Sequence, residues 1–306
     1  MKKPATRSRP VRRAPRQLQP GAAPFIVSAA ACLMALVATY LFFVKSATGQ
    51  FIDESAWVEA ALARRTIGTQ TAQWLDVLPV TSIVIAAVVI LFVTVARRRW
   101  KAAGIALVAM GAANLSTQLI KAGLPVRPNL GVETLAFNSL PSGHSTLAAS
   151  AAVAVFLVVS PRWRPAAGFL GGTYAIVSGI STVINQWHRP ADVMAAFFVV
   201  AFWAALAALV ILRTGPTWNV FSASSMHWAS RWWWTGLSAA LAVAAACTAV
   251  LILSSEIHHS QTSTFNFFLA GMGQIVACGY LLTAAGILLL GWQVRRRTQP
   301  RRARSR

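Results

Sequence analysis

The chain has 306 residues, of which 56% are hydrophobic and only 11% are charged. A soluble domain carries about 25% charged residues, so this composition excludes an ordinary soluble protein. The formal net charge of +21 would indicate nucleic-acid binding in a soluble chain. In so apolar a chain, basic residues more often set membrane topology and contact anionic lipid. We therefore expect membrane lipids, and no nucleic acid, as partners.

The first 23 residues form a basic, Pro-rich tail whose composition predicts disorder. An apolar run over 24–44 follows. It lacks a clear small-residue cleavage site and exceeds the ~7–15 apolar residues of a signal-peptide core. We interpret it as a retained transmembrane helix. A mitochondrial transit peptide is the alternative, because residues 1–52 contain no Asp or Glu.

Seven further apolar runs follow in the sequence. They cover residues 78–96, 102–120, 144–160, 166–186, 191–212, 233–253 and 267–292. About 18 apolar residues suffice to cross the hydrocarbon core of a bilayer. The sequence therefore predicts an all-α, polytopic transmembrane bundle of about eight helices. The three cysteines lie inside apolar runs without the spacing of metal ligands, so we expect neither a metal site nor a cofactor.

Lys and Arg are concentrated in alternate connections between the runs. If the N-terminus is cytoplasmic, the cytoplasmic segments hold 22 of the 28 basic residues, and all seven acidic residues lie on the other side. These segments are 1–23, 97–101, 161–165, 213–232 and 293–306. This positive-inside pattern predicts a multi-pass protein of the cell membrane with both termini cytoplasmic. The outer connections are then 45–77, with a short interfacial helix at 54–65, and 121–143, 187–190 and 254–266.

Three of the outer segments carry unusual chemistry, and the first is cationic. Lys121 ends the third run, and Pro125 prevents the helix from continuing. Arg127 follows, immediately before Pro128. A guanidinium matches phosphate oxygens bidentately, and an ammonium adds a point charge. Basic residues at a helix end are also common interfacial anchors, which is the alternative interpretation of this segment.

The second segment is Pro141-Ser142-Gly143-His144, at the start of the fourth run. Ser142 is a natural N-cap, and Gly143 lets the backbone approach a ligand closely. The backbone N–H groups at a helix N-terminus point at any anion bound there. His144 then lies in the first turn of the same helix. A capped helix with an incidental histidine is the alternative.

The third segment holds His188 and Asp192, on either side of Pro190. Residues at i and i+4 share one face of a helix, so Asp192 can accept a hydrogen bond from one ring nitrogen of His188. The other nitrogen is then left as a nucleophile or a base. All three segments are predicted to lie on one side of the membrane.

The order and spacing of these segments resemble the type-2 phosphatidic acid phosphatase superfamily of integral-membrane phosphatases. Its pattern is Lys-x6-Arg-Pro, then Pro-Ser-Gly-His, then Ser-Arg-x5-His-x3-Asp. Residues 141–144 match the second motif in full, and Ser181, His188 and Asp192 match the third. The family has a six-helix core, which the resemblance places at 24–212. A basic N-terminal tail (1–23), an added helix pair (213–292) and a basic C-terminal tail (293–306) complete the expected organisation.

The resemblance implies a role for each matching residue. His188 is expected to attack phosphorus and form a phosphohistidine, Asp192 to orient it, and His144 to protonate the leaving oxygen. The residues expected to bind the phosphoryl oxygens are Lys121, Arg127, Ser142 and the Gly143 amide. The resemblance requires no metal.

Two features depart from the family pattern. Lys121 and Arg127 are separated by five residues rather than six, and Thr182 replaces the Arg of the third motif. Losing a guanidinium that binds phosphate costs several kcal/mol of transition-state stabilisation. Arg189, beside His188, is the nearest substitute and is therefore expected to bind phosphate. A lipid headgroup anchor is the alternative role for Arg189.

The expected function is metal-independent hydrolysis of a lipid phosphate or pyrophosphate monoester at the outer leaflet, by a phosphohistidine intermediate. One alternative enzyme is a lipid phosphotransferase, which passes the phosphoryl group to another lipid. An alternative of another class is a non-catalytic lipid-phosphate binder or transporter, which Thr182 favours.

Overall fold

The computed structural model describes residues 21–133, 138–215, 218–221, 228–259 and 265–296, with the side chains of 221, 257–259 and 295–296 left out. The expected disordered tails therefore lie almost wholly outside the described residues.

Within the described ranges the chain is helical, as the sequence predicts, apart from one pair of two-residue strands. The α-helices are α1 (Ala23–Phe43), α2 (Ala47–Arg97), α3 (Trp100–Gly123), α4 (Gly143–Val158), α5 (Arg164–Ile184), α6 (Pro190–Thr214), α7 (Trp233–His259) and α8 (Asn266–Trp292). A 3₁₀ turn, η1 (Trp228–Ser230), precedes α7. Two short strands, β1 (Val220–Phe221) and β2 (Arg295–Arg296), pair in parallel.

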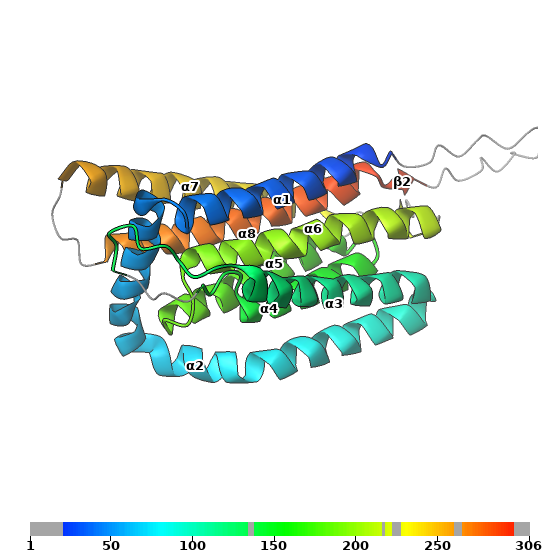
Figure 1. Ribbon diagram of the computed structural model, residues 1–306. Coiled ribbons are helices and arrows are strands. Elements are labelled where there is room, and N and C mark those ends of the chain that lie inside the picture. Colours follow the sequence, from blue (N-terminus) through cyan, green and yellow to red (C-terminus); the bar gives the residue numbers. More distant parts are fainter. Residues whose placement is uncertain (1–20, 134–137, 216–217, 222–227, 260–264, 297–306) are drawn as a thin grey trace, which may run out of the picture.

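Of the helices described, seven are long and apolar enough to cross a membrane. The exception is α4, which has 16 residues and is also apolar. The chain is thus a multi-pass membrane protein. In Figure 1 the helices form a bundle, and the described chain begins and ends at the same end of it.

Helix α2 differs most from the expectation. The outer loop predicted at 45–77 is wrong, because residues 47–97 form one continuous helix with Pro79 inside it. Ser46 is the N-cap, and its side chain accepts a hydrogen bond from the Gly49 amide at 3.1 Å. Figure 1 shows the first part of α2 crossing one end of the bundle before the helix turns to run along it. We call residues 47–71 the crossing segment.

The crossing segment is fastened to the helices beneath it. The indole of Trp57 donates to the Gln186 carbonyl at 2.8 Å, and the Gln186 amide returns a bond to the Trp57 carbonyl at 3.0 Å. Glu59 accepts from the Phe268 amide, at the start of α8, at 2.9 Å. A Cβ at Gly271 of α8 would lie 2.7 Å from Pro190 and 3.1 Å from Ala56, so only glycine permits this approach. The crossing segment therefore fixes the α5–α6 turn and the start of α8 together.

Candidate active site

The first motif lies at the end of the bundle covered by the crossing segment. Lys121 is half-buried in the last turn of α3, and Arg127 is buried in the connection from α3 to α4. The Nη2 atom of Arg127 is 3.1 Å from Oδ2 of Asp53, and both side chains are fully buried. Among the described residues, Nε and Nη1 of Arg127 have no hydrogen-bond partner. The guanidinium is thus held on one side and has two donors left for an anion.

The second motif begins α4, as the sequence predicts. Ser142 is the N-cap, and its hydroxyl oxygen accepts from the amide of Ser145 at 3.3 Å and from the hydroxyl of Ser145 at 2.9 Å. The amide of Ser142 donates to the Asp192 carbonyl at 2.9 Å, which connects the second motif to the third. A Cβ at Gly143 would meet only Nε2 of Gln118, at 3.7 Å. The space beside Gly143 is therefore open to a ligand.

The third motif forms the expected hydrogen bond. Nδ1 of His188 is 3.2 Å from Oδ2 of Asp192. The same oxygen accepts from the hydroxyl of Ser139 at 2.5 Å and from the Arg189 amide at 3.0 Å. Three donors converging on one buried carboxylate oxygen fix the position of the imidazole. Nε2 of His188 is thereby left as the free ring nitrogen.

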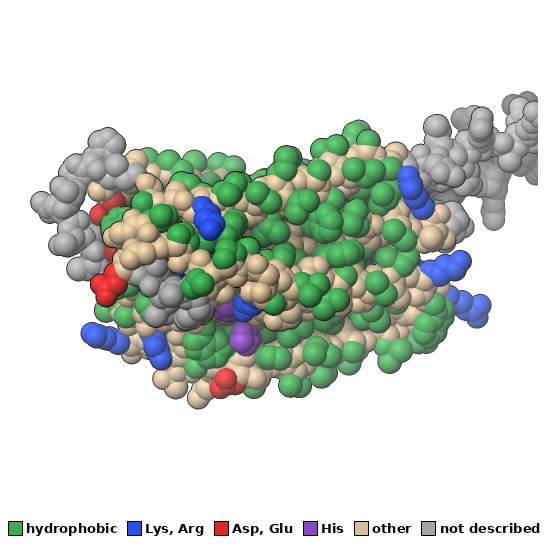
Figure 2. Space-filling view, in the orientation of Figure 1, with side chains coloured by type: hydrophobic (Ala, Val, Ile, Leu, Met, Phe, Trp, Pro, Cys, Tyr) green, Lys and Arg blue, Asp and Glu red, His purple; other side chains and the backbone are tan. Residues whose placement is uncertain are grey.

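His144 joins the three motifs into one site. Its ring centroid is 5.3 Å from that of Trp187, the residue before His188. Figure 2 shows purple histidine atoms at the surface, somewhat left of the middle of the molecule, with a blue basic side chain beside them. The fold therefore brings His144 next to the residue before His188, and Asp53, which pairs with Arg127 and accepts from the Ala191 amide at 3.0 Å, connects the first motif to the third.

The Arg189 side chain already has protein partners, unlike a side chain whose donors are all open to phosphate. Its Nε is 2.6 Å from Oε2 of Glu54, in a buried ion pair. Its Nη1 donates to the hydroxyl of Ser139 at 3.4 Å, and its guanidinium is 5.8 Å from the Trp57 ring centroid. Thr182, where the family has Arg, is fully buried and donates to the Gly179 carbonyl of its own helix at 2.7 Å. The phosphate-binding role of Arg189 stays a prediction.

Sequence reasoning missed the acidic partners of the two arginines. Gln50, Asp53, Glu54 and Trp57 fall at i, i+3, i+4 and i+7 of α2, which is one face of a helix. This polar face points inward: Gln50 donates to the carbonyls of Val44 and Pro128, at 2.9 and 3.0 Å. The helical spacing of these four residues is the signal that could have identified the face. Within the described part of the chain, no cluster of three or more His, Cys, Asp or Glu could hold a metal ion.

The fold is a helical membrane bundle with a site of His, Asp, Lys and Arg side chains at one end. Comparison with known proteins identifies the family to which this bundle belongs. The family model of the PAP2 superfamily matches residues 21–216, which is more than half of the chain. The chain therefore belongs to the PAP2 superfamily. Helices α7 and α8 lie outside the matched region.

A lipid A 1-phosphatase from Rhizobium johnstonii is similar to part of the chain. The two are 40% identical over 80 residues, which cover 26% of this chain and 31% of that protein. The chain thus matches about a third of the length of this curated relative. No solved structure matches the chain.

Proposed function

We propose that this protein is a lipid phosphate phosphatase that uses His188 as its nucleophile. The observation that carries the proposal is the pairing of His188 with Asp192, close to His144 and connected through Asp53 to Arg127, which keeps two unpaired nitrogen donors among the described residues. Membership of the PAP2 superfamily and the similarity to a lipid A 1-phosphatase support phosphatase chemistry on a lipid.

In the first step, Nε2 of His188 attacks phosphorus while the bond from phosphorus to the lipid oxygen breaks. His144 gives its proton to that oxygen, so the lipid leaves as an alcohol and the phosphoryl group stays on His188. The developing imidazolium charge is stabilised by Asp192. In the second step a water attacks the phosphohistidine, His144 accepts its proton, and inorganic phosphate is released.

The phosphoryl oxygens would be bound by the free donors of Arg127, by Lys121 and by the backbone amides at the start of α4, including Gly143. The hydroxyl of Ser142 already accepts two bonds from Ser145, so its proton remains available to a phosphoryl oxygen. We place this site on the extracytoplasmic face, with both termini cytoplasmic, because the basic connections lie at the opposite end of the bundle.

A non-catalytic lipid-phosphate binder is the second candidate, favoured by Thr182 and by the pairing of Arg189 with Glu54. In the first case Thr182 replaces the positively charged Arg of the family pattern. In the second the positive charge of Arg189 is already balanced by Glu54.

The test is release of inorganic phosphate by the purified protein from a panel of lipid phosphates and pyrophosphates, with and without EDTA. We expect release that EDTA leaves unchanged and that His188→Ala abolishes. Binding without release would favour the second candidate, and transfer of the phosphoryl group to an added lipid alcohol would indicate the phosphotransferase.

A further inference from the structure

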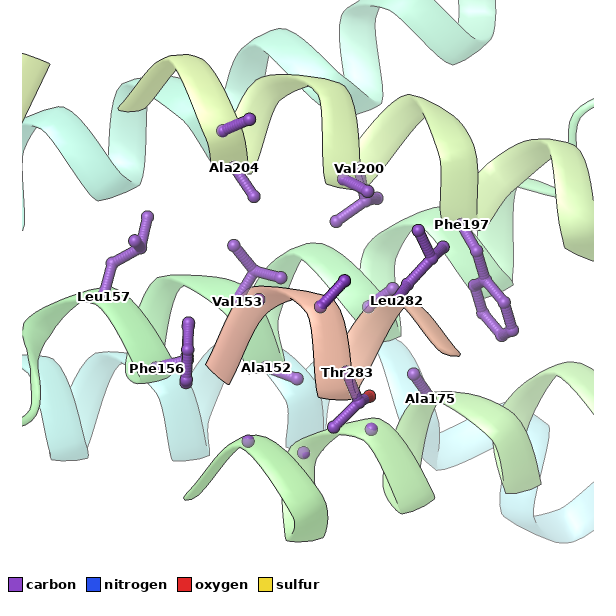
Figure 3. A pocket seen from close by; sticks show the side chains of 18 of the residues that line it. Ala152, Val153, Phe156, Leu157, Ala175, Phe197, Val200, Ala204, Leu282 and Thr283 are labelled. Atoms are coloured by element: carbon purple, nitrogen blue, oxygen red, sulfur yellow. The ribbon is translucent and has the colours of Figure 1, made fainter. Parts of the chain in front are cut away.

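A cavity of about 170 Å³ lies inside the bundle, away from the candidate active site. Helices α4, α5 and α6 of the family core line it together with α8, and Ser28 and Cys32 of α1 complete it. Fourteen of its 25 lining residues are Ala or Gly. Figure 3 shows Leu157 at one end and Phe197 at the other, with Leu282 and Thr283 of α8 beside the space between them. The family core and α8 thus line this space jointly.

The lining excludes water as the natural occupant. Its two hydroxyl groups are already used within their own helices: Ser28 donates to the Pro24 carbonyl and Thr283 to the Gly279 carbonyl, both at 2.8 Å. A buried water needs two to four polar partners, and apolar cavities of roughly 150 Å³ stay dry and take up hydrocarbon-sized ligands. Inside a membrane, the hydrocarbon available is an acyl chain.

Phe197 separates the cavity from the active site. Its ring lies within 3.5 Å of the Cβ positions that side chains at Gly179 and Gly279 would occupy. Phe197 is also five residues beyond Asp192 along α6, which places the cavity more than one helical turn deeper. The phosphate of a substrate at the catalytic histidines would therefore lie outside the cavity.

The other end of the cavity meets the basic end of the bundle. The carbonyl of Leu157 accepts from the Trp218 indole at 2.8 Å, and the Leu290 carbonyl accepts from the Asn219 amide at 3.1 Å. The Arg164 guanidinium stacks 3.9 Å from the Trp218 ring centroid. Exposed basic side chains surround this end, namely Arg97, Arg98, Lys101, Arg162 and Arg213. All seven acidic residues of the chain lie in segments at the opposite end.

We propose that the cavity holds an acyl chain of an anionic phospholipid from the leaflet at the basic end. The apolar, small-residue lining accepts the chain, and the unbalanced positive charge attracts the headgroup. Packing rather than the hydrophobic effect joins helices within a membrane, so a chain that fills this space fastens α8 to the family core. The proposal does not depend on phosphatase activity.

Gly286→Leu tests the proposal, because a Cβ at Gly286 lines the cavity and would meet only Phe156, at 3.9 Å. The matched control is Gly111→Leu on α3, where a Cβ would meet nothing within 4 Å and lies outside the cavity. Both changes replace an intrahelical glycine by leucine, so their gain in helix propensity is the same. Each protein is purified in mild detergent, and the bound lipid is measured by native mass spectrometry. Thermal unfolding is then followed with added phosphatidylglycerol or phosphatidylcholine.

We expect the wild type and Gly111→Leu to retain a phospholipid and to be stabilised more by phosphatidylglycerol than by phosphatidylcholine. In Gly286→Leu the retained fraction falls about tenfold, because the leucine side chain occupies space that the acyl chain fills and removes about 1.4 kcal/mol of its packing contacts. If Gly286→Leu does not fold, Ala204→Leu, which fills the cavity from α6, gives the same comparison with Gly111→Leu.

Equal lipid retention in the filled and control variants would overturn the proposal. So would equal stabilisation by the two lipids. A third result would also contradict the proposal. If the wild type carries no lipid and Gly286→Leu is more stable than Gly111→Leu, the cavity is an empty void that the leucine side chain fills.

Discussion

Asp53→Asn tests how the candidate site holds Arg127, the cation that we propose binds phosphate. The change leaves Arg127 buried without its counter-ion, because both side chains are fully buried and their charged atoms are 3.1 Å apart. Asn can still accept the bond that Asp53 takes from the Ala191 amide at 3.0 Å, so the loss is chiefly one of charge. Removing one partner of a buried ion pair costs about 3–5 kcal/mol. We expect the free energy of unfolding to fall by about this amount.

The assay is unfolding by SDS titration, paired with phosphate release at a temperature where the variant stays folded. Asp53→Asn combined with Arg127→Gln removes both charges, so we expect it to regain stability relative to Asp53→Asn alone but to remain inactive. Glu133→Gln, at an exposed position of the α3–α4 connection, is the control and should change neither property. A fully stable Asp53→Asn, or a double variant less stable than Asp53→Asn alone, would refute the reasoning.

Three further predictions concern the nucleophile, Arg189 and the topology. His188→Ala should abolish phosphate release, and Asp192→Asn should reduce kcat by about 10⁴ while the protein remains folded; wild-type release by His188→Ala would exclude His188 as the nucleophile. If Arg189 substitutes for the missing Arg at position 182, Arg189→Lys should lower kcat, and adding Thr182→Arg to Arg189→Ala should restore part of the lost activity. Wild-type kinetics in Arg189→Ala would leave Arg189 with only its structural contact to Glu54. With the native cysteines removed, cysteines at the exposed positions 45 and 133 should react with an impermeant thiol reagent in intact cells, whereas one at position 98 should react only after permeabilisation; the reverse pattern would place the site on the cytoplasmic face.

The membrane spans could be predicted from the sequence because they are long apolar runs, most of them bounded by charge or proline. The expected fourth span, 144–160, corresponds to α4 at Gly143–Val158, and the expected sixth, 191–212, to α6 at Pro190–Thr214. In the first half of α2 only the short helix at 54–65 was predicted, and it is confirmed as part of a longer helix. The rest was expected to be a loop because residues 47–77 mix polar and apolar side chains and form no long apolar run. A helix that crosses the end of a bundle does not need a continuous apolar run.

The site was predictable where it is local and unpredictable where it depends on tertiary contacts. The bond from His188 to Asp192 follows from i, i+4 spacing, and the cap at Ser142 follows from residue type. The ion pair of Arg189 with Glu54 joins residues 135 positions apart, and no local pattern indicates it. Only the folded arrangement shows that the cation beside His188 already has a carboxylate partner.

The measurement that tests the central claim most directly is rapid-quench trapping of the phosphoryl group on the enzyme. Purified protein is mixed with a lipid substrate labelled at phosphorus and is denatured in alkali, which preserves phosphohistidine. The bound label is then located by mass spectrometry after proteolysis. The account predicts label on His188, absent from His188→Ala and lost on treatment with acid. Release of phosphate by the wild type with no label on His188, or with label on another residue, would contradict it.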